Sequence, residues 1–276
     1  MPKRTPDLTP SGRRDWTNAV VVVTAGGNGI GAALARRFAA AGARVTVLDR
    51  DEDAAGRVAQ EIGGVACPVD VTDESALREA LRATLAREGR IDLCASNAGV
   101  QAVGGPEASD AAWEAAWAVN VLSQVYAARE LLPHFLERQS GTFLQTASAG
   151  GLLVEVGSAA YTATKAAVIG LAEWLSIKYR RKGIAVSVLC PAGVQTDFLN
   201  NGDPAHSFLQ THAIEADAVA AAAFAGLAEN RFLIVPEEHE QLLDFFGEKA
   251  RDYDRYLHLF SRVSEKIDRR RERSDA

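Results

Sequence analysis

Three features are scarce in this 276-residue chain: cysteine, basic charge in excess of acidic charge, and long apolar runs. No apolar run reaches the roughly 18 to 20 residues that a membrane helix needs. The N-terminal stretch MPKRTPDLTPSGRRD also lacks the apolar core of a signal peptide. Because hydrophobic residues still make up 47% of the sequence, the chain can build a sizeable core. We therefore expect a soluble cytoplasmic protein with no membrane partner.

The three cysteines give no sign of a disulfide framework or a metal centre. Cys67, Cys94 and Cys190 are far apart and lie in apolar, strand-like surroundings, without any Cys-x-x-Cys spacing. The five histidines show no metal-ligand spacing with one another or with cysteine. The sequence therefore predicts small buried thiols, histidines that lie mostly at the surface, and no metal site.

The net charge of −6 argues against a nucleic-acid partner, because phosphate binding needs a cationic face. The basic runs lie only at the ends, where Arg13-Arg14 and the closing RRRER indicate solvated tails or, alternatively, charged interaction tails. We divide the chain accordingly into a flexible extension (1–15), one domain (16–262) and a charged C-terminal tail (263–276).

Short β-branched runs alternate with longer alanine-rich stretches from about residue 19 to residue 235. This alternation is typical of repeated β-α-β units. The strand candidates are continuously apolar, which suits parallel strands that helices cover on both faces. The sequence therefore predicts an α/β fold, a three-layer doubly wound parallel sheet of seven strands in a single domain. The predicted strands are 19–24, 44–49, 65–70, 91–96, 141–147, 184–190 and 232–235, and the predicted helices are 29–41, 52–62, 73–88, 107–138 with a break or two, 158–182 and 214–229.

The stretch TAGGNGIG, residues 24–31, places four glycines between the first predicted strand and the first predicted helix. Taken alone, such a cluster can be a simple tight turn. At a helix N-terminus, however, glycines let backbone amides approach a pyrophosphate, which the helix dipole also favours. Asp49 ends the second strand about 20 residues later, the spacing of an acid that binds an adenosine ribose. Its charge would repel the 2′-phosphate of NADP and favours NAD, although Arg50 could contact such a phosphate.

These features resemble those of the classical short-chain dehydrogenases/reductases, and the resemblance extends from about Trp16 to Pro236. The family's first turn reads Thr-Gly-x-x-x-Gly-x-Gly. Here Ala25 replaces the first glycine and adds a methyl group at the tightest part of the turn. The resemblance implies a Rossmann fold with NAD as its cofactor, and coenzyme contacts at Gly26, Asn28, Gly29, Ile30 and Asp49.

Three later stretches resemble further coenzyme contacts of the family. Asp70 and Val71, at the end of the third strand, resemble the pair beside the adenine ring. Residues 96–99, Ser-Asn-Ala-Gly, resemble the family's Asn-Asn-Ala-Gly, which implies that Asn97 lies near the cofactor. Residues 191–196 resemble Pro-Gly-x-x-x-Thr, with alanine in the glycine position. This match implies that Val194 and Thr196 meet the nicotinamide carboxamide, and a plain loop is the alternative.

Tyr161 and Lys165 are four residues apart, so on a helix they share one face. Alone, the pair could equally face solvent on a long helix. Together with Asn120 and Ser148 it matches the family's Asn-Ser-Tyr-Lys tetrad. The resemblance implies that Ser148 polarises the substrate oxygen, that Lys165 also binds the nicotinamide ribose, and that Asn120 holds a water linking Lys165 to solvent.

The residue types suit hydride transfer between a carbinol carbon and a nicotinamide, because a proton must leave or join the oxygen. A tyrosine with its ordinary pKa near 10 is a poor base at neutral pH. We expect Lys165 to lower the pKa of Tyr161, which then acts as general acid/base. The predicted function is an NAD-dependent oxidoreductase that interconverts a secondary alcohol and a ketone. The alternatives are an NADP-dependent ketoreductase of the 3-oxoacyl reductase type and a non-catalytic dinucleotide-binding module.

The remaining segments suggest a substrate pocket and a subunit contact. Residues 197–213 have the length and turn-rich composition of a substrate lid. Glu155 lies where the pocket wall is expected, and it faces substrate, solvent or a neighbouring subunit. Segment 236–267, interrupted at Gly247, indicates a packed terminal helix or helix pair or, alternatively, a lid or subunit contact. The resemblance implies a homodimer or homotetramer paired through the two long helices. The side chains that predict a partly apolar pocket are Leu152, Leu153, Val154, Val156, Phe198, Leu199 and Phe208.

Overall fold

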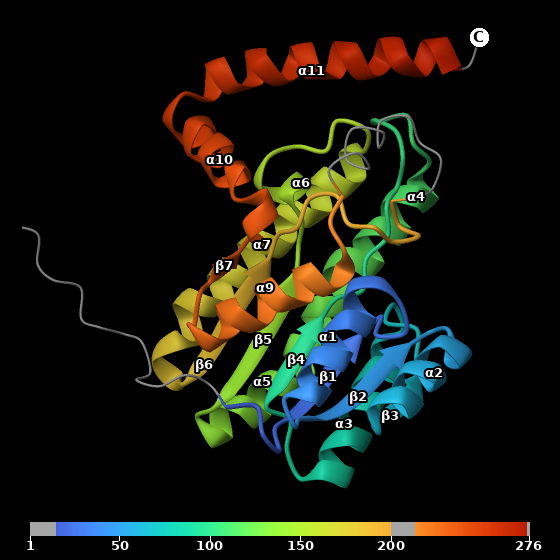
Figure 1. Ribbon diagram of the computed structural model, residues 1–276, viewed down its shortest axis with the longest axis vertical. Helices are drawn as coiled ribbons and strands as arrows, with labels where there is room; N and C mark the ends of the chain where they lie inside the picture. Colours follow the sequence, from blue (N-terminus) through green and yellow to red (C-terminus); the bar gives the residue numbers. More distant parts are fainter. Residues whose placement is uncertain (1–14, 200–212, 275–276) are drawn as a thin grey trace, which may run out of the picture.

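A parallel sheet of seven strands forms the centre of the computed structural model, which describes residues 15–199 and 213–274 (Figure 1). The strand order is β3-β2-β1-β4-β5-β6-β7, and every neighbouring pair is parallel. This sheet confirms the predicted doubly wound α/β fold. The strands are β1 (Val20–Thr24), β2 (Arg44–Asp49), β3 (Val65–Pro68), β4 (Leu93–Ser96), β5 (Gly141–Thr146), β6 (Ile184–Leu189) and β7 (Leu233–Ile234).

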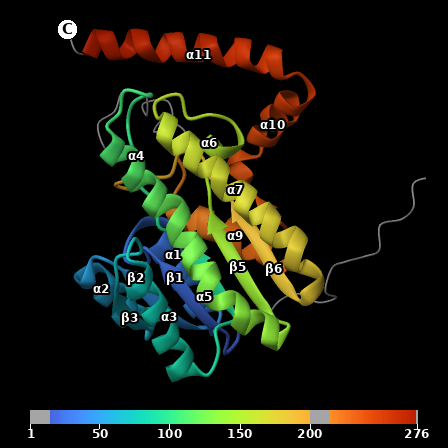
Figure 2. The ribbon, with the colours of Figure 1, turned by 180° about the vertical axis from the view of Figure 1, so that it is seen from behind.

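Helices cover both faces of the sheet because its strands are apolar on both sides. Residues 20–23 of β1 are valines with no exposed surface. Two separate hydrophobic clusters result, one on each face of the sheet. Figure 1 shows α1 and α9 in front of the strands, and Figure 2 shows α5 and α7 in front from the opposite side. The helices are α1 (Gly29–Ala40), α2 (Glu52–Ile62) and α9 (Ala216–Ala228) in one layer, and α3 (Glu74–Glu88), α4 (Asp110–Trp117), α5 (Ser123–Arg138) and α7 (Ala159–Tyr179) in the other.

The sheet changes winding direction between β1 and β4. Strand β1 pairs with β2 on one side and with β4 on the other, so the chain leaves these two strands toward opposite edges. Ligands of such sheets bind at the carboxyl ends of the strands, at the point where the order reverses. The loops after β1, β4, β5 and β6, which carry the predicted site residues, all lie at this edge.

The predicted helix 107–138 is three elements in the structure. A π-helical turn, η1 (Ala118–Leu122), separates α4 from α5, and it contains Asn120. A short helix, α6 (Ala149–Leu152), was not predicted; Ser148 caps it by accepting a hydrogen bond from the amide of Gly150 at 3.1 Å. Both departures from regular structure occur at predicted site residues, where π-turns and caps redirect the chain.

The C-terminal segment forms a helix pair, α10 (Gln241–Arg251) and α11 (Tyr253–Ser274), after a short 3-10 turn, η4 (Glu237–His239). The interruption predicted at Gly247 is wrong, because α10 continues through it. The chain instead breaks at Asp252, whose backbone leaves the helical region and whose carboxylate accepts from the amide of Arg255 at 3.0 Å. Helix α11 continues through 263–274, so the predicted charged tail is helical over that range.

Two other predicted segments lie partly or wholly outside the described residues. Of the N-terminal extension 1–15 only Asp15 is described, and of the predicted lid 197–213 only 197–199 and 213 are. The domain's described part begins with Trp16, a buried side chain that packs edge-on against Phe38 of α1 with 5.1 Å between the ring centroids. Among the described residues, no helix is both long enough and apolar enough to cross a membrane.

Candidate active site

The glycine turn brings the N-terminus of α1 tightly against the end of β1. A Cβ atom on Gly31 would overlap the carbonyl oxygen of Ala25, and one on Gly27 would lie 2.8 Å from Cβ of Ala54. Asn28 occupies the cap position of α1 but makes no side-chain cap hydrogen bond. The first-turn amides, which an α-helix leaves without partners, therefore remain available to an anion. This turn fits the pyrophosphate of a dinucleotide.

Ala25, which stands at a usual glycine position, has φ of +49°. That left-handed conformation costs a residue with a Cβ atom about 1 kcal/mol relative to glycine. The strain lies in the predicted binding turn itself. At the second departure, Ala192 has no positive φ, and therefore needs no glycine.

Asp49 ends β2 beside the glycine turn and faces the same cavity. One carboxylate oxygen accepts from the amide of Gly27 at 2.9 Å, and the other accepts from the amide of Asp51 at 3.0 Å. These bonds fix the carboxylate at the place where the sequence predicts a ribose. The charge of Arg50 acts on Asp70, whose pKa is held below its usual range mainly by hydrogen bonds from Thr72.

Asn97 and the loop after β6 complete the predicted coenzyme wall. Asn97 accepts from the hydroxyl of Thr146 at 3.1 Å, which links the ends of β4 and β5. A Cβ atom on Gly29 would lie 3.1 Å from Cγ2 of Thr196, so this loop reaches back to the glycine turn. The predicted residues that line the cavity are Asn28, Gly29, Ile30, Asp49, Asn97, Val194 and Thr196.

The structure does not bring three predicted coenzyme residues to the cavity wall. Gly26 lies behind the turn, where its amide donates to the carbonyl of Leu48 at 3.1 Å. Val71 is a buried member of a hydrophobic cluster. The carboxylate of Asp70 accepts from the amide and hydroxyl of Thr72 at 2.9 and 2.7 Å. The contact of Asp70 and Val71 with an adenine stays a prediction.

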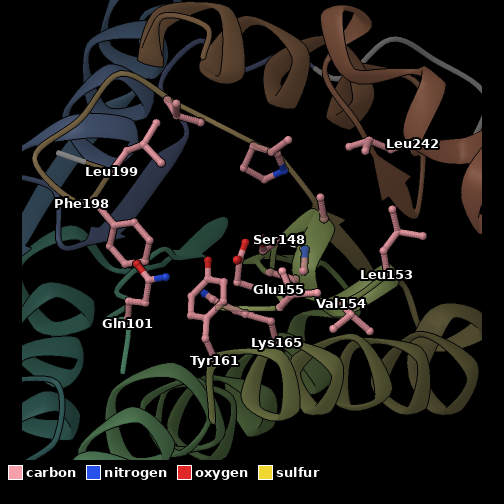
Figure 3. A pocket seen from close by; sticks show the side chains of 18 of the residues that line it. Gln101, Ser148, Leu153, Val154, Glu155, Tyr161, Lys165, Phe198, Leu199 and Leu242 are labelled. Carbon is pink, nitrogen blue, oxygen red and sulfur yellow. Dashed lines mark hydrogen bonds between the residues drawn. The ribbon is translucent and has the colours of Figure 1, made fainter. Parts of the chain in front are cut away.

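Tyr161 and Lys165 lie in the first turns of α7, on the same face, with Ser148 across from them (Figure 3). Ser158 caps the helix by accepting from the amide of Tyr161 at 3.1 Å. The ammonium of Lys165 donates to the carbonyl of Thr146 at 3.0 Å and lies 5.5 Å from the centre of the Tyr161 ring. Three of the four predicted catalytic side chains, those of Ser148, Tyr161 and Lys165, line one cavity.

Burial controls the ionisation of Tyr161 and Lys165, the two titratable groups predicted to be catalytic. It raises the pKa of Tyr161 well above its ordinary value, a shift that a hydrogen bond with Ser148 opposes and the charge of Glu155 increases. It lowers the pKa of Lys165 to about 8. The expected depression of the phenol pKa by Lys165 is thus not produced by the side chains of the protein alone, because desolvation dominates.

Asn120 is fully buried and does not line the cavity. Its side-chain oxygen accepts from the amide of Val100 at 2.8 Å, and its side-chain nitrogen donates to the carbonyl of Val100 and to the hydroxyl of Thr164, both at 2.9 Å. The side chain thereby ties the loop after β4 to α7. The backbone carbonyl of Asn120 accepts from the side-chain nitrogen of Gln124 at 3.1 Å. The predicted water-holding role stays a prediction.

Two further titratable side chains, Cys190 and His239, are buried after β6 and after β7, respectively. Cys190 is buried as predicted, and burial raises its pKa to about 12, so it is a neutral thiol beside Lys165. Cys94 is also buried, whereas Cys67 is only half-buried. His239 is buried, although most histidines were expected at the surface, and its Nδ1 accepts from the amide of Ala192 at 3.1 Å. It thus holds the turn after β6.

The cavity has a volume of about 1250 Å³ and extends from the glycine turn past the predicted catalytic residues to α10 and α11. Glu155 lies on its wall, as Figure 3 shows. A Cβ atom placed on Gly150 would lie 3.1 Å from Cβ of Glu155, 3.5 Å from the Tyr161 ring and 3.6 Å from the Ser148 hydroxyl, so these three side chains surround one small space. Of the predicted apolar wall, Leu153, Val154, Val156, Phe198 and Leu199 line the cavity; Leu152 does not, and Phe208 lies outside the described residues.

The residues of α10 and α11 that line the cavity were not assigned to the site from the sequence. Their signal was the near-helical spacing of leucine and aromatic residues after Pro236, which indicated one helix or a helix pair and left a lid or a subunit contact as alternatives. Among the described residues, no group of three or more His, Cys, Asp or Glu side chains could hold a metal ion.

The model of the family described as short chain dehydrogenase matches residues 19–206. The chain belongs to the short-chain dehydrogenase family. Among its relatives, a meso-2,3-butanediol dehydrogenase of Serratia marcescens is 35% identical over 67% of this chain and 75% of its own length. A 3beta-hydroxysteroid dehydrogenase of Eggerthella lenta is 33% identical over 64% of this chain and 71% of its own length. A solved short-chain dehydrogenase/reductase of Burkholderia phymatum, in complex with NAD, is 28% identical with a TM-score of 0.79, covering 87% of this chain and 96% of its own.

Proposed function

We propose that this short-chain dehydrogenase is an NAD-dependent oxidoreductase that interconverts a secondary alcohol and a ketone, with Tyr161 as its general acid/base. The observation that carries the proposal is one continuous cavity. It joins the glycine turn and Asp49 to Ser148, Tyr161 and Lys165. The names of the butanediol and hydroxysteroid relatives support a CH–OH group as the reacting centre.

The proposed choice of NAD over NADP rests on Asp49. Its carboxylate lines the cavity and is fixed by two backbone amides. A carboxylate at this place binds the free hydroxyls of a ribose and repels a 2′-phosphate.

The catalytic side chains can manage the proton of the reaction. When bound, NAD⁺ supplies a hydride acceptor and a positive charge. In the proposed reaction Ser148 donates to the substrate oxygen, and Tyr161 accepts the alcohol proton. With its pKa of about 8, Lys165 is mostly protonated at neutral pH, so its ammonium favours the phenolate that this transfer requires. Burial of the phenol makes this assistance necessary, since without it desolvation disfavours ionisation.

The test is the Tyr161→Phe variant, which removes the hydroxyl and keeps the ring. We expect kcat for oxidation of secondary alcohols to fall by about 10²- to 10⁴-fold, the usual contribution of a general acid/base. Affinity for NADH, titrated side by side with NADPH by fluorescence, should stay at the wild-type value and exceed that for NADPH. A variant that keeps its activity would refute the mechanism. Tighter binding of NADPH would favour the ketoreductase alternative, and NADH binding without turnover of any alcohol or ketone would favour a non-catalytic module.

A further inference from the structure

We propose that α10 and α11 form the roof of the substrate site and bind the body of a bulky, apolar, uncharged alcohol or ketone at a distance from its reacting carbon. The proposal rests on the proposed function, because the roof covers the same cavity as Tyr161 and Ser148. The volume of about 1250 Å³ exceeds the roughly 300–1,000 Å³ of ordinary ligand pockets. The site can therefore hold more than a dinucleotide and a small alcohol.

One face of α11 is apolar and lines the cavity. The spacing of its residues places them on a single side of the helix. Figure 1 shows α11 crossing above the sheet and α6, which agrees with a position over the carboxyl ends of the strands. The face consists of Tyr256, Leu259, Phe260, Val263 and Ile267.

Lys249 fixes the roof to the wall beside the catalytic residues. Its ammonium donates to the carbonyls of Leu152 and Leu153 at 2.8 and 3.2 Å, both in the segment that follows Ser148. The same ammonium lies 5.6 Å from the ring of Tyr253 and 5.5 Å from that of Tyr256. Backbone carbonyls and aromatic rings together hold this cation. The start of α11 is thereby positioned over the cavity.

Tyr256 marks the point where a ligand would meet the roof. The side chain is only 3% exposed, lines the cavity and stacks near Phe260 with 4.3 Å between ring centroids. Among the described residues, its phenol oxygen has no hydrogen-bond partner. A buried polar group left without a partner is costly, and a ligand or water that enters the cavity relieves this cost.

The charges of the site favour an uncharged substrate. The roof contributes two acidic and two basic residues to the cavity, Glu248, Asp252, Arg255 and Lys266, so its formal charge cancels. Nearer the reacting centre the wall contributes Glu155, whose charge already raises the pKa of Tyr161. A carboxylate or phosphate beside Glu155 would be repelled by that acid, whereas the ammonium of Lys165 is directed to the carbonyl of Thr146.

The experiment compares two leucines of α11. Leu259 and Leu257 are 49% and 50% exposed, but only Leu259 lines the cavity. Oxidation of 2-alkanols from 2-butanol to 2-decanol with NAD⁺ is followed in wild type, Leu259→Gln and Leu257→Gln. We expect wild-type kcat/KM to rise by about three- to fourfold per methylene, the effect of burying one such group. Leu259→Gln should lose about tenfold on 2-decanol and nothing on 2-butanol, while Leu257→Gln should match wild type.

If wild-type kcat/KM does not depend on the chain length of the alkanol, the roof proposal is wrong. Equal losses of kcat/KM in Leu259→Gln and Leu257→Gln would also overturn it, because the two changes would then act through folding or a subunit contact. A second measurement does not need turnover. Calorimetric titration of 2-decanone into the protein with NADH should show binding that Leu259→Gln weakens and Leu257→Gln does not. If Leu259→Gln alone weakens 2-decanone binding but no alkanol is oxidised, the proposed function is refuted and the roof proposal stands. If alkanols are oxidised but the two variants bind 2-decanone equally, the roof proposal is refuted and the proposed function stands.

Discussion

At the scale of single residues, Lys165 shows the cost of building this site. Its ammonium is 2% exposed and, among the described residues, forms no ion pair within the usual distance; the carbonyl of Thr146 is its hydrogen-bond acceptor. Burial therefore lowers its pKa to about 8. A cation buried in this way reduces the free energy of unfolding, so a residue that serves activity lowers the stability of the protein.

We expect Lys165→Met to be inactive and yet more stable than wild type at pH 7, by about 1–2 kcal/mol after the lost hydrogen bond is subtracted. Its Tm in differential scanning calorimetry should be about 2–8 °C higher. Because folding lowers this pKa, the unfolded chain holds more protons between pH 8 and 10.5, and wild type gains stability as the pH rises through that window. The advantage of the variant should shrink accordingly. Exposed Lys178→Met on the same helix should change little, and a less stable Lys165→Met would contradict the argument.

At the scale of elements, the β1–α1 turn depends on the absence of side chains at particular glycines. A Cβ atom on Gly31 would overlap a backbone oxygen, which cannot move aside as the end of a flexible side chain can. Gly56 of α2 is different, because nothing lies within 4 Å of the place its Cβ would take. The two glycines therefore separate the effect of close packing from that of helix propensity.

We expect Gly31→Ala to destabilise the protein by about 2–3 kcal/mol, as overpacking does, and to abolish tight NADH binding because the first turn of α1 must shift. Gly56→Ala should instead stabilise by about 0.5–1 kcal/mol, since alanine is the better helix former. Urea unfolding and fluorescence titration with NADH measure the two effects. Equal behaviour of the variants would show that the turn tolerates a side chain.

The sequence predicted elements whose signals are local. The apolar strands and a helix that starts near Asp73 follow from short-range rules, and in the structure the carboxylate of Asp73 caps α3 by accepting from the amide of Ala76 at 3.0 Å. The π-turn around Asn120 could not be predicted, because an extra residue in a helical turn leaves the apolar periodicity almost unchanged. The expected break at Gly247 failed for a related reason. Glycine permits a break, but the Asp252 cap makes one.

At the scale of the whole molecule, α7 presents apolar side chains to solvent. Trp174 is 54% exposed and Ile177 is 84% exposed, and they lie three residues apart on the helix. Exposed apolar patches of this kind mark contacts with other chains. They support the proposed homodimer or homotetramer, in which α5 and α7 pair across a two-fold axis.

We expect Ile177→Glu to lower the molar mass of the protein in multi-angle light scattering to that of a single chain at micromolar concentration, because the two-fold axis places the new charge near its copy. Leu243→Glu, at an exposed leucine of α10, is the control and should leave the mass unchanged. An unchanged mass in Ile177→Glu, or a monomeric wild type, would contradict this pairing.

The sequence by itself determined the parallel sheet, the glycine turn and the shared helix face of Tyr161 and Lys165, because each depends on periodicity or spacing between near neighbours in the chain; that the pair belongs to a site came from the family resemblance. Only the tertiary structure decided what surrounds these groups. It placed Asp70 and Val71 away from the cavity wall, buried the Tyr161 phenol so that its pKa rises, and brought α11 over the site. Burial and the contacts between segments far apart in the sequence depend on how the elements pack, which no local pattern records.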